Sequence, residues 1–257
     1  FSGQPCDMPA IHDLSKRYGF KIIEDASHAI GASYNQIKVG SCTHSDITVF
    51  SFHPIKIITT AEGGMALTND KNIADKRLLG EDSSISDTND KAKMKQQSEK
   101  EIWNYQQIDL GFNYRMNDIQ AALGLNQMKR LDEYIKRRHE IAKHYDDTLI
   151  NLPLVTPWQS PGNYSSYHLY PILIEENLIQ KTQRQVYEKL IKNDIAVNLH
   201  YIPVHRQPYY ENLGFKKNDF PQAESFHRKV LSIPMYAILK DDQQKYVVET
   251  IAKVISE

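Results

Sequence analysis

The chain has 257 residues, of which 40% are hydrophobic and 25% charged, and its 31 basic side chains nearly balance 32 acidic ones, for a net charge of −1. This ordinary globular composition supports one large domain or two smaller ones, and the charge balance provides no basic field that would attract nucleic acid. No apolar run approaches the roughly 18 residues of a membrane span and no signal-peptide pattern is present, so we expect a cytoplasmic protein without membrane or nucleic-acid partners.

The first part of the chain predicts one helix followed by short strands. Asp7 suits an N-cap, Pro9 suits the first turn, and Gly19 is placed to end the helix. Three strands are then predicted at residues 20–25, 46–52 and 63–69. This alternation favours an α/β layer with a parallel or mixed sheet, in which catalytic side chains collect at the carboxyl ends of the strands.

The middle of the chain predicts a polar excursion and then a long helical run. Residues 81–100 carry almost no large apolar side chains, so we expect a mobile segment there. From residue 117 to about 151, apolar residues recur three and four apart, and Gly124 marks the place where this helical run would break. Basic residues at 129–140 alternate with acids, which favours a solvated face over a phosphate-binding patch.

After a Pro/Gly/Ser-rich connection at residues 151–166, the pattern of strands and helices begins again. It predicts a strand at 167–175, a helix at 182–194 that begins with a capping box of Thr182 and Gln185, a strand at 196–203 and two further helices. We therefore predict an α/β protein of two parts. Residues 1–150 would belong to the large domain with its long connecting helix, and residues 151–257 would form a small C-terminal domain.

The segment FSFHPIKIITTAEGGMALTN, residues 50–69, places Lys56 among apolar and β-branched side chains. A buried ammonium must be paired or have its pKa lowered, and a lysine amine with a lowered pKa is a nucleophile toward carbonyls. One use of such an amine is the Schiff base with pyridoxal phosphate (PLP), which also needs an acid at its ring nitrogen and donors for its phosphate. Asp25 and Ser51, at two predicted strand ends, could supply these groups, although spacing alone leaves a surface lysine equally open. No Cys/His ligand spacing points to a metal site.

Three segments carry a resemblance to a known family. EDASHAIGASY, SFHPIKIITTAEGGM and GFNYRMNDIQAALGLNQMKRLDE resemble, in order and spacing, the hallmark segments of the DegT/DnrJ/EryC1/StrS sugar aminotransferases. These are fold-type-I PLP-dependent transferases, similar in fold to aspartate aminotransferase, and the resemblance runs from Phe1 to the C-terminus. Together with HYIPVHRQPYY, residues 200–210, the segments are most similar to members that act in pseudaminic acid biosynthesis. The resemblance implies a homodimer that transfers an amino group from glutamate to a UDP-linked 4-keto-6-deoxy sugar.

The resemblance also implies roles for individual residues. Lys56 would form the Schiff base with PLP and carry a proton, and Asp25 would keep the ring nitrogen protonated. His28 would lie near the ring, although by itself it also fits a histidine of the core. Ser51 would bind the cofactor phosphate, and Asn113 would reach the phosphate of the neighbouring subunit. A separate set, His200, Tyr201 and His205, matches the part of the small domain that faces the sugar nucleotide.

The sequence departs from the family pattern at its start. It begins at Phe1, without the small-residue phosphate loop and the stacking aromatic residue of the family's N-terminal segment. We therefore expect either a portion of a longer protein or a truncated one. Two alternatives stay open: a non-catalytic remnant or interaction module of the same fold, and a PLP-dependent sugar dehydratase. Lys56 disfavours the dehydratase, because those relatives carry histidine in its place.

Overall fold

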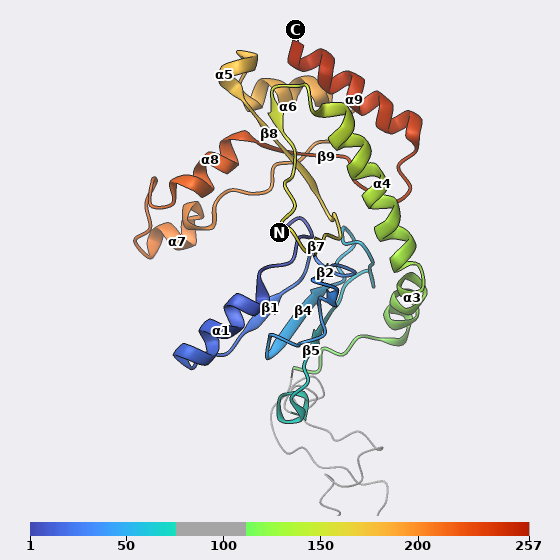
Figure 1. Ribbon diagram of the computed structural model, residues 1–257, viewed down its shortest axis with the longest axis vertical. Coiled ribbons are helices and arrows are strands. Elements are labelled where there is room, and N and C mark those ends of the chain that lie inside the picture. The colour runs from blue at the N-terminus through green and yellow to red at the C-terminus, as the bar shows by residue number, and fades with distance from the viewer. Residues whose placement is uncertain (76–111, 257) are drawn as a thin grey trace, which may run out of the picture. The chain divides into compact units, whose positions relative to one another are not determined.

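The computed structural model describes residues 1–75 and 112–256, which belong to two compact units (Figure 1). The lysine unit comprises Cys6–Ser27 and Ile37–Lys129, and the C-terminal unit comprises Phe1–Pro5, His28–Gln36 and Arg130–Glu257. The mobile segment expected at residues 81–100 lies outside the described residues. The division of the protein into domains at residue 150 stays a prediction. None of the helices in the described residues combines the length and apolar character needed to span a bilayer.

The lysine unit contains a helix and a three-stranded mixed sheet. Helix α1 (Met8–Tyr18) is capped by Asp7, whose carboxylate accepts the N–H of Ala10, and it ends at Gly19, where φ is +73°. The sheet has the order β1-β4-β5, in which β1 (Ile23–Asp25) runs parallel to β4 (Ile47–Ser51) and β5 (Gly64–Leu67) runs antiparallel to β4. A two-residue strand, β3 (Ile37–Lys38), lies in the connection between β1 and β4. The predicted helix and mixed sheet are confirmed, with strands shorter than the predicted segments.

Two helices take the place of the single predicted helical run. Helix α3 (Asp118–Met128) begins at a capping box formed by Asn117 and Gln120, and helix α4 (Leu131–Leu149) begins after a break at residues 129–130. The prediction of a break near Gly124 is wrong, because Gly124 lies inside α3. A glycine weakens a helix by only about 1 kcal/mol, and here its missing side chain lets α3 pass close to Thr60.

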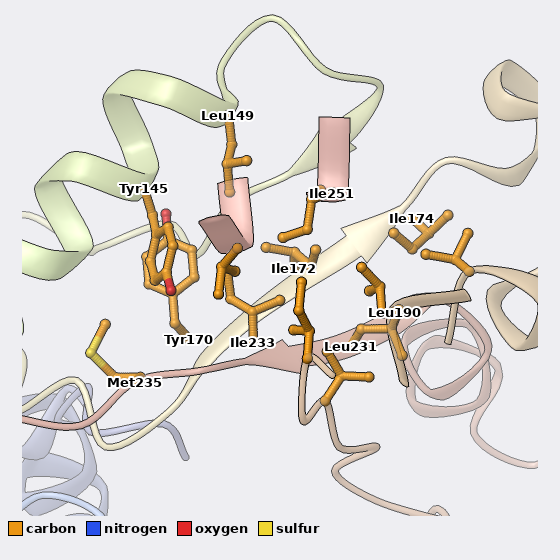
Figure 2. Close-up of a cluster of buried hydrophobic side chains, with 14 of the residues drawn as sticks. Tyr145, Leu149, Tyr170, Ile172, Ile174, Leu190, Leu231, Ile233, Met235 and Ile251 are labelled. Carbon is orange, nitrogen blue, oxygen red and sulfur yellow. The ribbon is translucent and has the colours of Figure 1, made fainter. Parts of the chain in front are cut away.

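The C-terminal unit is built around an antiparallel sheet with the order β6-β8-β9. Its strands are β6 (Leu154–Val155), β8 (Tyr170–Ile174) and β9 (Val230–Ile233). Side chains of β8 and β9 form one core with those of helices α4, α6 (Gln183–Lys192) and α9 (Asp241–Ser256). The rings of Tyr145 and Tyr170 pack in this core with their centroids 5.0 Å apart. Both are labelled in Figure 2. A separate pair of short strands, β2 (Ser33–Tyr34) and β7 (Asn163–Tyr164), is also antiparallel.

The second half of the chain confirms some predicted elements and contradicts others. Strand β8 and helix α6 with its Thr182/Gln185 capping box are confirmed. The predicted strand at 196–203 is wrong: only Asn198 pairs, through a bridge to Ser232, and the chain then continues past Pro203, which has no N–H to donate. The remaining elements are α5 (Glu176–Ile179), the 3-10 turn η1 (Val204–Arg206), α7 (Pro208–Asn212) and α8 (Pro221–Lys229). Strand β9 and three helices thus follow residue 203, where two helices were predicted.

The basic cluster at residues 129–140 is only partly solvated. The side chain of Arg138 is 6% exposed, and its Nη1 donates to the carbonyl oxygens of Tyr167, His168 and Met235 at 2.9, 3.3 and 3.0 Å. Burial lowers the pKa of this guanidinium to about 10. The expectation of a solvated face is therefore wrong for Arg138, which lies on α4 and binds backbone carbonyl groups elsewhere in the same unit.

Candidate active site

The parallel pair β1 and β4 brings two predicted site residues to the same edge of the sheet. Asp25 is aligned with Val49, so Ser51 lies two residues farther along the neighbouring strand. The Asp25 carboxylate accepts hydrogen bonds from the N–H and Oγ of Ser27, at 3.0 and 2.5 Å. The Oγ of Ser51 accepts the N–H of His53 at 3.4 Å. Both side chains thus lie at the strand ends where the sequence predicts them.

Lys56 lies in the connection from β4 to β5, in a segment that we call the lysine loop (residues 52–60). The carbonyl oxygen of Phe52 accepts both the N–H of Thr60, at 3.0 Å, and the Oγ1 hydroxyl of Thr59, at 2.8 Å. These two bonds close the base of the loop. Within it, the N–H of Lys56 donates to the carbonyl oxygen of His53 at 2.9 Å. The loop is therefore a turn that hydrogen bonds close at its base, and Lys56 lies within it.

The environment of the Lys56 amine lowers its pKa relative to that of an exposed lysine. Its side chain is half-buried, and the next two residues, Ile57 and Ile58, are only 7% and 1% exposed. Burial lowers the pKa of the Lys56 amine below the ordinary value for lysine, and the Asp25 carboxylate raises it, which offsets part of the shift. Because the net shift is downward, more of the amine is neutral at a given pH than in an exposed lysine. A neutral amine is the form that attacks carbonyls.

The turn after the lysine loop requires glycine. Gly63 has φ of +157°, and a Cβ there would lie 2.3 Å from Oγ1 of Thr60. A Cβ on Gly64 would lie 2.9 Å from the carbonyl oxygen of Phe50. Neither position therefore has room for a side chain, and the role of both glycines is conformational. The carboxylate of Glu62, in the same turn, lies 3.8 Å from Nε2 of His53.

Asn113 lies in the segment that leads to α3. Its side chain is exposed and its φ is +54°, a left-handed conformation that asparagine adopts more readily than most residues. The rings of its neighbours Phe112 and Tyr114 are in contact, with centroids 5.5 Å apart. Contact of Asn113 with a cofactor phosphate in a neighbouring subunit stays a prediction.

Other predicted residues belong to the C-terminal unit, which brings His28 and Tyr201 to the ring of Phe1. The Phe1 ring centroid is 6.0 Å from that of His28 and 6.5 Å from that of Tyr201. The Nδ1 of His28 accepts the N–H of Ser2 at 3.3 Å, and its ring lies 4.3 Å from the ring of His168. His28 is therefore held in a defined orientation, as expected both for a functional histidine and for a core histidine.

The two histidines predicted to face the sugar nucleotide are buried and held by protein partners. Nδ1 of His200 lies 2.8 Å from Oγ of Ser232, and Nε2 of His205 lies 2.9 Å from Oε1 of Glu224. The hydrogen bond from His205 is the main cause of a lowered pKa at Glu224. Tyr201, by contrast, is 53% exposed. Of the three residues, Tyr201 has the side chain most open to solvent.

A model of the DegT/DnrJ/EryC1/StrS aminotransferase family matches residues 1–252. The chain belongs to this family. The resemblance of the three sequence segments is thereby confirmed over nearly the whole chain. Among the described residues, no group of three His, Cys, Asp or Glu side chains is arranged to hold a metal ion.

Individual relatives agree with this assignment. The chain is 34% identical over 259 residues to the UDP-4-amino-4,6-dideoxy-N-acetyl-beta-L-altrosamine transaminase of Campylobacter jejuni, covering 100% of this chain and 64% of the relative. Helicobacter pylori PseC, an aminotransferase involved in the biosynthesis of pseudoaminic acid, matches with a TM-score of 0.87 and 29% identity over 99% of this chain and 65% of PseC. Spr1654 of Streptococcus pneumoniae in its PMP-form matches with a TM-score of 0.83 and 26% identity over 98% of this chain and 66% of Spr1654.

These matches confirm the predicted fold class and the resemblance to transaminases of pseudaminic acid biosynthesis. The chain has the fold-type-I architecture of PLP-dependent sugar aminotransferases. It spans 64% to 66% of the length of the first curated relatives that it matches.

The sequence patterns did not point to Gln120 and Gln127 of α3, which bind the lysine loop and the turn after it. Oε1 of Gln127 accepts the N–H of Thr59 at 2.9 Å, and Nε2 of Gln120 donates to the carbonyl oxygen of Glu62 at 3.1 Å. Gly124 lies four positions after Gln120 and three positions before Gln127, so all three residues share one face of the helix. This spacing of two amides and a glycine among mostly apolar neighbours was the available signal.

Proposed function

We propose that the protein is a PLP-dependent aminotransferase that transfers an amino group from glutamate to a UDP-linked 4-keto-6-deoxy sugar, in nucleotide-sugar biosynthesis for surface glycans. The observation that carries this proposal is the half-buried position of Lys56, in the loop that follows the strand end with Ser51 and next to the strand end with Asp25. Membership of the sugar aminotransferase family supports the reaction class. The printed names of the Campylobacter transaminase and of PseC support the choice of sugar.

The lysine unit would supply three groups for PLP: an amine, a carboxylate and a hydroxyl. When bound, PLP supplies an aldehyde that captures amines and a ring that withdraws electrons from the carbon next to the captured nitrogen. Lys56 offers the amine, Asp25 a carboxylate that would balance the charge of a protonated ring nitrogen, and Ser51 a hydroxyl for the phosphate. Asp25 and Ser51 come from adjacent ends of β1 and β4, and the lysine loop follows directly. The PMP-form and PLP-form of Spr1654 support the same cofactor.

The tasks of these side chains follow from their surroundings. Nζ of Lys56 would hold the cofactor and would also take a proton from the α-carbon of the amino donor. A neutral amine is required for both tasks, and burial of Lys56 favours that form. The carboxylate of Asp25 keeps its orientation because the N–H and hydroxyl of Ser27 bind it. A charge held by two hydrogen bonds needs less reorganisation during the reaction than an unrestrained one.

The remaining predicted roles extend the same proposal. We propose that His28 contacts the cofactor ring. We also propose that the protein is a cytoplasmic homodimer in which Asn113 binds the cofactor phosphate in the site of the partner subunit. We also propose that Tyr201 contacts the sugar nucleotide, since its side chain is largely exposed. We propose the same contact for His200 and His205, whose rings are held by hydrogen bonds with Ser232 and Glu224.

The test is covalent labelling of the full-length protein. PLP is added, the Schiff base is reduced with borohydride, and the labelled peptide is identified by mass spectrometry. We expect the label on Lys56, and we expect Lys56→Arg to lose both the label and amino transfer while keeping its circular dichroism spectrum. The exposed Lys71 provides a matched control, since Lys71→Arg should change neither. Turnover at the wild-type rate in Lys56→Arg would refute the assignment, and labelled protein without amino transfer to any keto sugar would favour the non-catalytic alternative.

A further inference from the structure

Helix α3 presents one face to the segment that follows Lys56. Gln120, Gly124 and Gln127 lie on this face, at positions i, i+4 and i+7. Their contacts are with residues of the lysine loop and of the turn after it: Thr59, Thr60 and Glu62. The helix therefore supports the chain directly after the lysine by two side-chain hydrogen bonds and one close packing contact.

The packing contact fixes the distance between the helix and the loop. A Cβ on Gly124 would lie 2.7 Å from Cγ2 of Thr60, so the methyl group of Thr60 occupies the space above the glycine. Thr60 is 2% exposed, and its Oγ1 donates to the carbonyl oxygen of Glu62 at 2.8 Å. Because the methyl group of Thr60 already lies against Gly124, the loop cannot move closer to α3 at this point without a clash.

The bond from Gln127 determines the position of the main chain itself. The N–H of Thr59 is half-buried and needs an acceptor, and Oε1 of Gln127 provides it at 2.9 Å. The hydroxyl of Thr59 has other partners, because it donates to Phe52 and accepts the N–H of Ala61 at 2.9 Å. Gln127 thus holds a backbone group three residues after Lys56.

We propose that Gln127 is a positioning residue for Lys56, which it serves by accepting the Thr59 N–H and so fixing the lysine loop against α3. This inference rests on the proposed function of Lys56. Without the acceptor, the half-buried N–H of Thr59 loses its bond and the loop can shift, which moves the amine relative to Asp25. Misplacement of a reacting group by about 1 Å can cost on the order of 100-fold in rate. We therefore expect kcat to fall by about 10-fold to 100-fold, with KM changed by less than about two-fold.

Two substitutions separate the hydrogen bond from the volume of the side chain. Gln127→Met keeps the length but removes the acceptor, whereas Gln127→Glu keeps an acceptor oxygen. Asn126→Ala, at an exposed neighbouring position on α3, is the control. The first readout needs no cofactor: amide hydrogen exchange of the peptide that contains Thr59 in the full-length protein. Exchange should be faster in Gln127→Met than in wild type, and unchanged in Gln127→Glu and Asn126→Ala.

The second readout is steady-state kinetics on the same variants with PLP. We expect the fall in kcat in Gln127→Met alone, with rescue in Gln127→Glu to within about three-fold of wild type. Wild-type exchange or wild-type kcat in Gln127→Met would overturn the positioning role, as would an equal loss in Gln127→Glu. Labelling of Lys56 is measured alongside. Absence of label in the wild type refutes the proposed function and the inference with it, whereas a labelled wild type with an unimpaired Gln127→Met refutes the inference alone.

Discussion

Substituting Gly124 by alanine tests the close contact between α3 and the lysine loop. The added methyl group would lie 2.7 Å from Cγ2 of Thr60, closer than two carbon atoms can approach without a shift. Thr60 is buried and hydrogen-bonded to Glu62, so it has little freedom to move away. Overpacking of this kind costs about 1–3 kcal/mol. Alanine also stabilises the helix by about 1 kcal/mol relative to glycine, because its helix propensity is higher. We therefore expect Gly124→Ala to lower the free energy of unfolding by about 1 kcal/mol.

A compensating change identifies the clash as the cause. Thr60→Ser removes Cγ2 and keeps the hydroxyl that bonds to Glu62, at a cost of about 1 kcal/mol for the lost methyl group. In the double variant the new methyl of residue 124 fills the space that Thr60 has vacated. Its destabilisation should therefore be smaller than the sum of the two single effects by about 1 kcal/mol or more.

The assay is urea-induced unfolding followed by circular dichroism, carried out on the wild type, both single variants and the double variant. Strictly additive effects would refute the packing argument, because they would show that residues 124 and 60 do not compete for the same space. A Gly124→Ala variant that is more stable than wild type by the full helix-propensity gain would refute it as well.

Three further predictions concern other parts of the chain. Arg138→Met should lower the free energy of unfolding by about 2–4 kcal/mol, because the buried carbonyl groups lose a charged donor while the aliphatic part of the side chain is kept. A loss below about 1 kcal/mol in urea titrations would contradict this role. In cofactor-free protein, Asp25→Asn removes the charge that raises the pKa of Lys56. The acylation rate of Lys56, measured by mass spectrometry, should therefore reach half of its maximum at a lower pH than in wild type. A shift to higher pH would show that Asp25 does not stabilise the ammonium. If Asn113 serves the partner's site, mixing Asn113→Ala and Lys56→Ala subunits should restore activity, because each heterodimer then has one intact site. If heterodimers form but activity does not recover, Asn113 belongs to its own subunit's site.

Features fixed by local chemistry were predictable from the sequence. The bounds of α1 follow from a capping aspartate, Asp7, and a glycine, Gly19, that accepts a left-handed conformation. The start of α6 follows from the reciprocal bonds of Thr182 and Gln185. The places of Asp25 and Ser51 follow because each lies at the end of a short segment rich in apolar and β-branched residues. In each case, the decisive contacts lie within a few residues of one another.

Features that depend on distant partners were not predictable. Strand β9 begins at Val230, directly after α8, without a turn residue between them, and its place is set by pairing with β8. Arg138 has the sequence context of a surface cation, but its partners are carbonyl groups at least 29 residues away. Gln127 was missed for the same reason, since its donor is a backbone N–H 68 residues earlier. Sequence patterns describe which face of a helix is buried, but they do not identify the backbone group that the face meets.

The C-terminal unit is discontinuous, and this has a consequence for how the chain folds as it is made. Phe1–Pro5 and His28–Gln36 belong to a unit whose other residues begin at Arg130. The carbonyl oxygen of Gly3 accepts the N–H of Ser166, and the side chain of Gln4 accepts the N–H of Ser160, 156 residues later. During synthesis these early segments leave the ribosome long before their partners exist, whereas β1, β4 and β5 can pair as soon as residue 67 has emerged. The sheet of the lysine unit can therefore form before the C-terminal unit can assemble around Phe1–Pro5 and His28–Gln36.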